Sequence, residues 1–363
     1  MVVVVDQPPP GLFSEQNRSI AQGAEVAVDE LNAKGGLLAR HIHIKLVRQS
    51  LDGLSASAVQ ARLRSEAAAV LILPCDTNSQ LSLAAGASTF GMLMLAPCNP
   101  DATAGGRYST YWPVGMAATD EAAGLASVMD RVGYRQAFVV SAPGTSYVEL
   151  LTNAFRSVAQ TEGIQVVGSA SINTTSTDFS GLARAIKAAS PSPTAIFTAL
   201  PPPLVNRVAA GLLAQGVGQT VLGGTAMDTP LTLASDPKAK GPKALENAIF
   251  ASYGFPRASA SGSGFIGDYR TTFGGEPVGA FPGLGFETIR LLEAAVHKAG
   301  SAEPSAIQQA LAGGIALQGV ALATRTYEPG GDHNPVGTVA VTKIASGSFF
   351  PLLAVTPGKV PTP

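Results

Sequence analysis

The stretch "GAEVAVDELNAKGGLLARHIHIKLV", residues 23–47, combines a helix, an abrupt stop and a strand. Apolar residues recur at helical spacing and form one face of a helix that starts near Ser19. They are Ala21, Ala24, Val28 and Leu31. The pair Gly35-Gly36 supplies the left-handed backbone that ends a helix, and residues 41–47 then alternate polar and apolar, as a half-buried strand does. We therefore predict a helix that reverses at the glycines into a neighbouring strand.

The same alternation of helix and strand continues along the chain in two series. Continuous apolar strands that follow amphipathic helices are typical of parallel sheets covered on both faces. In the first series these strands are 68–74 and 92–97, and in the second they are 136–142, 194–200 and 220–224. After residue 246 helices outnumber strands, which indicates that the chain returns to the first lobe. We expect an α/β fold with two doubly wound parallel-sheet lobes.

The composition fits a compact, turn-rich protein. The 363 residues exceed what one core comfortably holds, and 46% of them are hydrophobic. The net charge of −1 gives no electrostatic basis for binding nucleic acid or an anionic membrane. No apolar run reaches the roughly 18 residues that a membrane-spanning helix needs. The start, Met1–Val5, is too short for a signal peptide, so we interpret it as a first strand from which any export signal has already been removed.

Few residues offer the chemistry of metal binding or catalysis. The histidines and cysteines lack the spacing of metal ligands. They are His41, His43, His297, His333, Cys75 and Cys98. We interpret His41 and His43 as one exposed face of a strand. Because the sequence also lacks GxSxG, P-loop and HExxH motifs, we expect no metal, no cofactor and no enzymatic activity.

Several segments resemble one known family in order and spacing. They are "GAEVAVDELNAKGGLLARHIHI", "LMLAPCNPDAT", "TDEAAGLASVMDRVGYRQAFVV" and "PGLGFETIRLLEAAVHKAG". The chain resembles the type I periplasmic solute-binding proteins of ABC importers, in the group of the leucine/isoleucine/valine-binding proteins. The resemblance implies two lobes joined by three crossings, 1–117 with 249–327 and 118–248 with 328–363. It also implies a ligand cleft between the lobes that closes by a hinge motion.

The resemblance implies a function as well. We expect an extracytoplasmic binding protein that captures a small organic solute and presents it to the membrane permease of an ABC importer. We expect it to be monomeric and to have no nucleic-acid partner. A receptor or regulator of the same fold is the alternative. The solute is a small amino acid bound in a shifted pose, an aromatic or aliphatic carboxylate, or a neutral amide-like compound.

In open α/β sheets, ligands bind beyond the carboxyl ends of the strands. The sequence places Asp6, Cys75-Asp76, Cys98-Asn99 and Thr225 at such ends. In amino-acid binders of the resembled family, a serine after the third strand and an Ala-x-Thr after the fourth hold the ligand carboxylate. Here Asp76 takes the place of that serine, and Cys98 and Asn99 replace the Ala-x-Thr.

The remaining candidates of the first lobe surround these loops. Thr77 and Asn78 follow Asp76, and the alternative reading is that Asp76 or Asn78 only caps the next helix. Phe13 and Gln16 from the first loop and Phe281 before a long helix complete the expected wall. For Phe281, core packing is the alternative.

In the second lobe, Tyr147 matches the aromatic residue that covers the ligand in the family, with packing at a helix start as the alternative. Pro201 stands in a stretch where the family often has aromatic residues. The acidic residue that takes the ligand ammonium is expected at Gly224 or Thr225, and the nearest acid in the chain is Asp228. This departure puts ordinary recognition of α-amino acids in doubt.

Cys75 and Cys98 follow strands that we expect to be parallel neighbours. Their Cα atoms are then within the disulfide range of about 4.4–6.8 Å. The family often pairs the first of these cysteines with one after the second strand, but the residues around Ser50 include no cysteine. Either Cys75 and Cys98 form a bridge, or both are buried free thiols.

Overall fold

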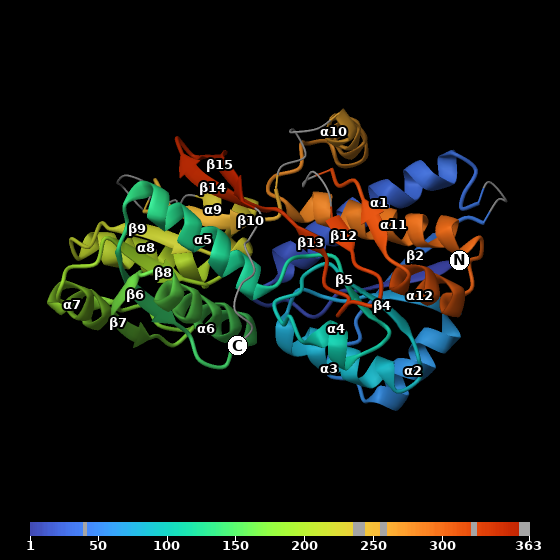
Figure 1. Ribbon diagram of the computed structural model, residues 1–363, viewed down its shortest axis with the longest axis horizontal. Coiled ribbons are helices and arrows are strands. Elements are labelled where there is room, and N and C mark those ends of the chain that lie inside the picture. Colours follow the sequence, from blue (N-terminus) through green and yellow to red (C-terminus); the bar gives the residue numbers. More distant parts are fainter. Residues whose placement is uncertain (39–41, 235–243, 255–259, 321–324, 356–363) are drawn as a thin grey trace. The chain divides into compact units, whose positions relative to one another are not determined.

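The computed structural model describes residues 1–38, 42–234, 244–254, 260–320 and 325–355 (Figure 1). The chain forms two compact units. Unit 1 consists of Met1–Ala117 and Phe255–Thr338, and unit 2 of Ala118–Gly254 and Val339–Pro363. The polypeptide therefore passes from one unit to the other three times.

Two of these passages lie later in the chain than predicted. β10 (Ile249–Ser252) was assigned to the first lobe, but it pairs with strands of unit 2 on both sides. β12 (Arg325–Tyr327) and β13 (Val336–Gly337) pair with each other in unit 1, so this unit extends past the predicted end at residue 327. Strand partners are chosen by tertiary contacts that the local pattern does not encode.

Unit 1 contains a five-stranded sheet in the order β2-β1-β3-β4-β5, with every pair parallel. Its strands are β1 (Val2–Asp6), β2 (Lys45–Gln49), β3 (Ala68–Ile72), β4 (Leu93–Ala96) and β5 (Tyr111–Pro113). The strand order reverses between β1 and β3, because the chain builds β2 on one side of β1 and then β3 on the other. At such a reversal the loops after the two strands diverge and leave room for a ligand.

Helices and a small sheet complete unit 1. The helices are α1 (Ser14–Ala33), α2 (Ala56–Ser65), α3 (Thr77–Ser88), α4 (Ala104–Arg107), α10 (Ala260–Phe273), α11 (Phe281–Ala299) and α12 (Pro304–Ala312). β11 (Ile315–Leu317), β12 and β13 form an antiparallel three-stranded sheet. α1 and α11 come from opposite ends of the unit's sequence and lie side by side (Figure 1).

The opening helix and strand form, but with different limits. α1 starts at Ser14, five residues before the predicted Ser19, and Gly35 and Gly36 take φ values of +96° and +78° as expected of a left-handed stop. The strand begins at Lys45 instead of residue 41, because the Asn32 side chain pairs with both backbone groups of Ile44 at 2.8 Å. His43 is exposed before the strand, and His41 lies outside the described residues.

Unit 2 contains a seven-stranded sheet in the order β15-β14-β10-β9-β8-β6-β7. Its further strands are β6 (Gln136–Ser141), β7 (Gln165–Ser171), β8 (Ala195–Thr198), β9 (Thr220–Gly223), β14 (Val339–Ala345) and β15 (Ser348–Val355). The core of the sheet is parallel, whereas β14 and β15 are antiparallel additions at one edge. The predicted fold class is thus correct for the parallel core, and the antiparallel edge was not foreseen.

The other elements of unit 2 are helical. They are α5 (Ala118–Val132), α6 (Ser146–Thr161), α7 (Ser180–Ala188), α8 (Leu204–Ala214), the 3₁₀ turn η1 (Thr225–Met227) and α9 (Pro230–Leu233). The strand order in this sheet reverses between β6 and β8. The loops that follow these two strands, before α6 and α8, are therefore the counterparts in unit 2 of the loops that follow β1 and β3 in unit 1.

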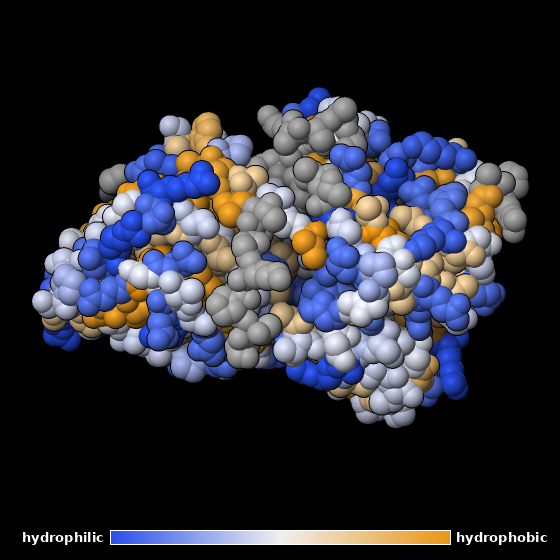
Figure 2. Space-filling model, in the orientation of Figure 1, coloured by the Kyte–Doolittle hydropathy of each residue, from blue (hydrophilic) through white to orange (hydrophobic). Residues whose placement is uncertain are grey.

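The exposed apolar residues are dispersed. They include Leu54, Val132, Leu213 and Val336, each on a different element or loop, while Phe350 and Leu352 share the edge strand β15. Figure 2 shows one face on which hydrophilic and neutral residues cover most of the surface and apolar residues form small patches. Single exposed apolar residues are normal on folded proteins. Among the described helices, none combines the length and the hydropathy needed to span a bilayer.

Candidate functional site

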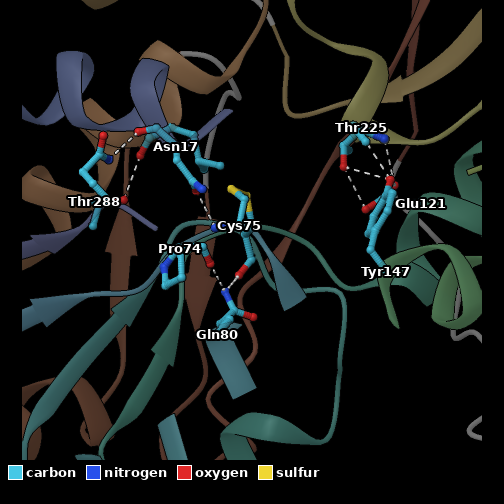
Figure 3. The surroundings of a disulfide bond; sticks show 12 residues. Asn17, Pro74, Cys75, Gln80, Glu121, Tyr147, Thr225 and Thr288 are labelled. Carbon is cyan, nitrogen blue, oxygen red and sulfur yellow. Dashed lines mark hydrogen bonds between the residues drawn. A yellow bond between two sulfur atoms is a disulfide. The ribbon is translucent and has the colours of Figure 1, made fainter. Parts of the chain in front are cut away.

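A disulfide joins two loops at the carboxyl edge of the unit 1 sheet. Cys75 follows β3 and Cys98 follows the neighbouring strand β4, and their Cα atoms lie 5.1 Å apart (Figure 3). Of the two alternatives for these cysteines, the structure shows the bridge. Because both cysteines are buried, the bond is shielded from solvent.

Two buried amide side chains hold the backbone on either side of this disulfide (Figure 3). Asn17 Oδ1 accepts a hydrogen bond from the Cys75 N–H at 2.7 Å. Gln80 Nε2 donates to the carbonyls of Pro74, at 2.9 Å, and Cys98, at 2.6 Å. The two loops are therefore fixed covalently and by hydrogen bonds. Sequence reasoning missed Asn17 and Gln80, and the only signal was a polar residue on the buried face of each helix.

Asn99 is part of the same scaffold. Its side chain is fully buried, with Oδ1 accepting from the Tyr111 hydroxyl at 3.1 Å and Nδ2 donating to Asn334 Oδ1 at 3.0 Å. Both ends of the amide are thus engaged inside unit 1. Its predicted contact with a ligand stays a prediction.

Asp76 caps α3, as the alternative reading of this residue stated. Its Oδ1 accepts from the Ser79 N–H at 3.0 Å. Thr77, the first residue of α3, is buried, and its hydroxyl has no hydrogen-bond partner in the part of the chain that the structure describes. Asn78 is exposed. Of these three predicted residues, Thr77 alone presents an unused buried polar group.

Asp6 ends β1, on the other side of the strand reversal. Its Oδ1 accepts from the Leu51 N–H at 2.8 Å, while Oδ2 has no partner among the described residues. Burial raises the pKa of the Asp6 carboxyl from 3.8 to about 6, against the opposing effect of that hydrogen bond.

Phe13, Gln16 and Phe281 lie at the starts of helices in unit 1. Phe13 caps α1, Gln16 lies in the first turn of α1, and Phe281 is the first residue of α11. All three are buried. The structure thus places them in the packing at the starts of α1 and α11, and their role in lining a ligand site stays a prediction.

Unit 2 gathers its polar groups around a residue that the sequence analysis missed. Glu121, in the first turn of α5, is fully buried. Its Oε2 accepts from the Tyr147 hydroxyl at 3.0 Å and from the Thr225 N–H at 2.9 Å, and its Oε1 accepts from the Thr225 hydroxyl at 3.0 Å (Figure 3). Burial raises the pKa of the Glu121 carboxyl from 4.5 to about 7, although these hydrogen bonds act in the opposite direction.

The predicted residues Tyr147 and Thr225 are therefore brought together, but around Glu121. Neither Gly224 nor Thr225 carries a carboxylate, and the one that lies beside Thr225 comes from α5, about a hundred residues earlier in the chain. Gly224 allows the approach, because a Cβ there would lie 2.2 Å from the Tyr147 hydroxyl and 2.7 Å from Glu121 Oε2. The available signal was a glutamate within the otherwise apolar face of α5.

Asp228 and Pro201 have other partners within unit 2. Asp228 is fully buried and accepts a hydrogen bond from the Ser252 hydroxyl at the end of β10. The Pro201 carbonyl accepts from the N–H groups of Leu204, at 3.0 Å, and Val205, at 3.1 Å, and so starts α8. Across the described ranges, no group of three or more histidine, cysteine, aspartate or glutamate residues is arranged to hold a metal ion.

Replacing both cysteines by serine is expected to lower the free energy of unfolding by about 3 kcal/mol, since the bridge restricts the unfolded chain across a sequence separation of 23. Urea unfolding followed by circular dichroism measures the change. Dithiothreitol should lower the wild-type midpoint to that of the variant and leave the variant unchanged. Equal midpoints for the oxidised and reduced wild type would contradict this prediction.

Comparison with known proteins agrees with this architecture. A family model described as "Periplasmic binding protein" matches residues 5–348. The chain is 24% identical over 318 residues to a Leu/Ile/Val-binding protein of Rhizobium johnstonii, which covers 86% of this chain and 83% of the relative.

Two solved structures have the same fold. A leucine-binding protein of Thermotoga maritima is 19% identical, with a TM-score of 0.84 and 98% of both chains covered. A solute-binding protein of an ABC transporter from R. palustris, in complex with benzoate, is 16% identical, with a TM-score of 0.83 and 99% of this chain and 98% of that chain covered. These matches confirm the fold class predicted from the sequence.

Proposed function

The chain belongs to the periplasmic binding protein family, as its sequence motifs predicted. We therefore propose that it is the extracytoplasmic solute-binding protein of an ABC importer. It captures a small amino acid or a related organic carboxylate and delivers it, chemically unchanged, to a membrane permease. Relatives described as Leu/Ile/Val-binding and leucine-binding support this class of solute. The hinge closure and the monomeric state implied by the resemblance stay predictions.

The observation that carries the proposal is the start of α3 in unit 1. This helix begins at the reversal of strand order, where the first backbone N–H groups of a helix lack partners within the helix and attract anions. The unused hydroxyl of Thr77 lies there, and the disulfide with Gln80 fixes the loop in front of it. Asp76 directs Oδ1 to the Ser79 N–H. The helix start, the Thr77 hydroxyl and the fixed loop suit a carboxylate group, whereas the Asp76 carboxylate at the same helix start repels one.

A thermal-shift screen tests the proposal. The purified protein is heated with amino acids, aromatic acids, short fatty acids and amides, each in separate samples. A solute that binds only the folded protein stabilises it by about 2.7 kcal/mol at a hundred times its dissociation constant, so the melting temperature rises. We expect a rise with one or more amino acids or carboxylates.

A matched pair of variants locates the bound carboxylate. Thr77→Val removes the buried hydroxyl and keeps the side-chain volume, so affinity is expected to fall by about 10-fold. Thr272→Val makes the same change on the exposed surface of α10 and should leave affinity unchanged. No temperature rise with any compound of the library would contradict solute capture of this class and would favour the receptor or regulator of the same fold.

A binder of aromatic acids is the second candidate. Two observations favour it, namely the missing acid at Gly224 and Thr225 and the solved relatives in complex with benzoate and 4-hydroxybenzoate. The same screen separates the candidates, because an aromatic-acid binder responds to benzoates and not to amino acids.

A further inference from the structure

β7 forms one edge of the seven-stranded sheet of unit 2 (Figure 1). It pairs with β6 along one side, and among the described ranges no strand pairs with it along the other. The Ile172 N–H donates to the Ser141 carbonyl at 2.9 Å, so in this parallel ladder every second residue of β7 faces β6. The backbone N–H and C=O groups of Ser169 and Ser171, which lie between those residues, therefore point outward.

The other edges of the two large sheets carry features that hinder pairing with a further strand. β2 exposes Lys45 and Arg48, β15 contains Pro351 and a register shift, and β5 is only three residues long. Charged residues, proline, irregular register and short length are the usual protections of a sheet edge. β7 has a register shift near its start, but residues 168–171 pair regularly with β6, and no charged residue occurs in 163–177. The second half of β7 is thus open to an added strand.

A pocket of about 330 Å³ lies at the carboxyl end of this edge. Ala170 and Ser171 of β7, the loop that follows them and the start of α7 line it. Of the described residues in this lining, Asp178 is the only charged one. The pocket therefore offers a single negative charge beside the outward backbone groups of the strand.

The Asp178 carboxylate is ionised at neutral pH. Its Oδ1 accepts from the Ser180 N–H at 2.9 Å, and its Oδ2 accepts from the Ser180 hydroxyl at 3.1 Å. These hydrogen bonds, together with Arg184 nearby, lower the pKa of the Asp178 carboxyl from its usual value. Because Asp178 is exposed and each oxygen accepts about two hydrogen bonds, both oxygens can accept from a further donor.

We propose that the second half of β7 binds an extended segment of a partner protein, which adds a strand to the sheet and places a lysine or arginine side chain in the pocket beside Asp178. In this mode of recognition the backbone hydrogen bonds provide affinity, and the pocket provides specificity. Charge complementarity with Asp178 selects the basic side chain. This surface lies within unit 2 and is independent of the proposed capture of a solute.

Fluorescence anisotropy with labelled heptapeptides tests this surface. The first probe, Thr-Val-Thr-Lys-Thr-Val-Thr, has high strand propensity, and the second has norleucine in place of lysine. We expect the lysine probe to bind with a dissociation constant below about 1 mM, and about 5-fold more tightly than the norleucine probe. A third probe, in which two prolines replace the residues before the lysine, lacks backbone donors on both sides of the strand and should not bind.

Two variants of β7 separate backbone pairing from other contacts. Ser169→Pro removes an outward N–H and leaves the ladder with β6 in place, so it should weaken the lysine probe by about 10-fold or more. Ser169→Thr keeps that N–H and should bind like the wild type. Thermal unfolding of both variants shows whether they fold.

A second pair of variants tests the charge in the pocket. Asp178→Asn keeps an acceptor for the Ser180 N–H but removes the charge, so the preference for lysine over norleucine should disappear. Asp268→Asn makes the same change on the exposed surface of α10 and should keep the 5-fold preference, within about 2-fold.

Hydrogen exchange provides a readout that needs no variant. In the wild-type chain the lysine probe should slow the exchange of the Ser169 and Ser171 amides. The Ile172 amide, which is already bonded to Ser141, should change little. Nuclear magnetic resonance resolves the exchange of these amides individually.

Each contrary outcome overturns the proposed surface. These outcomes are equal binding of the lysine and norleucine probes, unchanged binding by Ser169→Pro, unprotected serine amides, and no binding of the lysine probe at about 1 mM. A wild-type protein that sediments as a dimer, and as a monomer after Ser169→Pro, would show that a second copy of the chain occupies this edge instead. None of these results affects solute capture, which the thermal-shift screen tests separately.

Discussion

Replacing Gly23 by alanine is expected to lower the free energy of unfolding by about 3 kcal/mol, since the new methyl group overpacks a contact between two helix backbones. The added Cβ would lie 1.7 Å from the carbonyl oxygen of Pro282 in α11. Gly285 of α11 makes the reciprocal approach, with its missing Cβ 2.0 Å from the Ile20 carbonyl oxygen of α1. The helices must therefore separate to accept a side chain at either place.

Urea unfolding of the variants measures this effect, and Gly267→Ala is the control. Gly267 lies in α10, where an added Cβ meets no atom within 4 Å. Alanine is the better helix former by up to about 1 kcal/mol, so this control should be as stable as the wild type or slightly more stable. If Gly23→Ala unfolds at the same urea concentration as Gly267→Ala, the two helices are not in backbone contact.

Arg325→Met is expected to lower the free energy of unfolding by about 3–5 kcal/mol, because it leaves the Glu287 carboxylate buried without its cation. Arg325 Nη2 lies 3.0 Å from Glu287 Oε2, and the two side chains are 2% and 1% exposed. Arg325 also donates to the Val114 carbonyl, and Tyr327 donates to the Pro113 carbonyl at 2.8 Å. The substitution thus removes an ion pair and a link between β12 and the residues after β5.

Two further variants show whether the lost charge pair is the cause. Glu287→Leu combined with Arg325→Met removes both charges and should recover part of the lost stability. Arg270→Met breaks the exposed pair of Arg270 and Glu276, whose side chains are 57% and 39% exposed, and should cost less than about 1 kcal/mol. If the single variant Arg325→Met has the same free energy of unfolding as the wild type in chemical denaturation, the Glu287 carboxylate does not depend on Arg325, and the prediction is wrong.

The local pattern of residues was enough to predict the repeating units of the fold. The apolar strands, the amphipathic helices and the Gly35-Gly36 stop depend on neighbours within a few positions, and these features were correct. The neighbouring positions of Cys75 and Cys98 also followed from this pattern, since consecutive apolar strands of a parallel sheet bring their carboxyl ends to one edge.

The local pattern did not predict which residues pair when they lie far apart in the sequence. β10 looks like any short apolar strand, and only its hydrogen bonds with β9 and β14 assign it to unit 2. The delayed start of β2 has a similar origin, because Asn32 engages Ile44 from the preceding helix. Such partners lie more than ten residues away or in another part of the chain, where spacing along the sequence carries no information about contact.

The candidate site was also predictable from the sequence only in part. The chain's own order of residues determined which loops end the strands and that Gly224 and Thr225 provide no carboxylate. Folding alone brought Glu121 to that place and turned Tyr147 toward it, because a buried carboxylate must find donors wherever the packed structure offers them. Periodicity thus reports which face of an element is apolar, whereas the partner of each buried polar group is selected by three-dimensional packing.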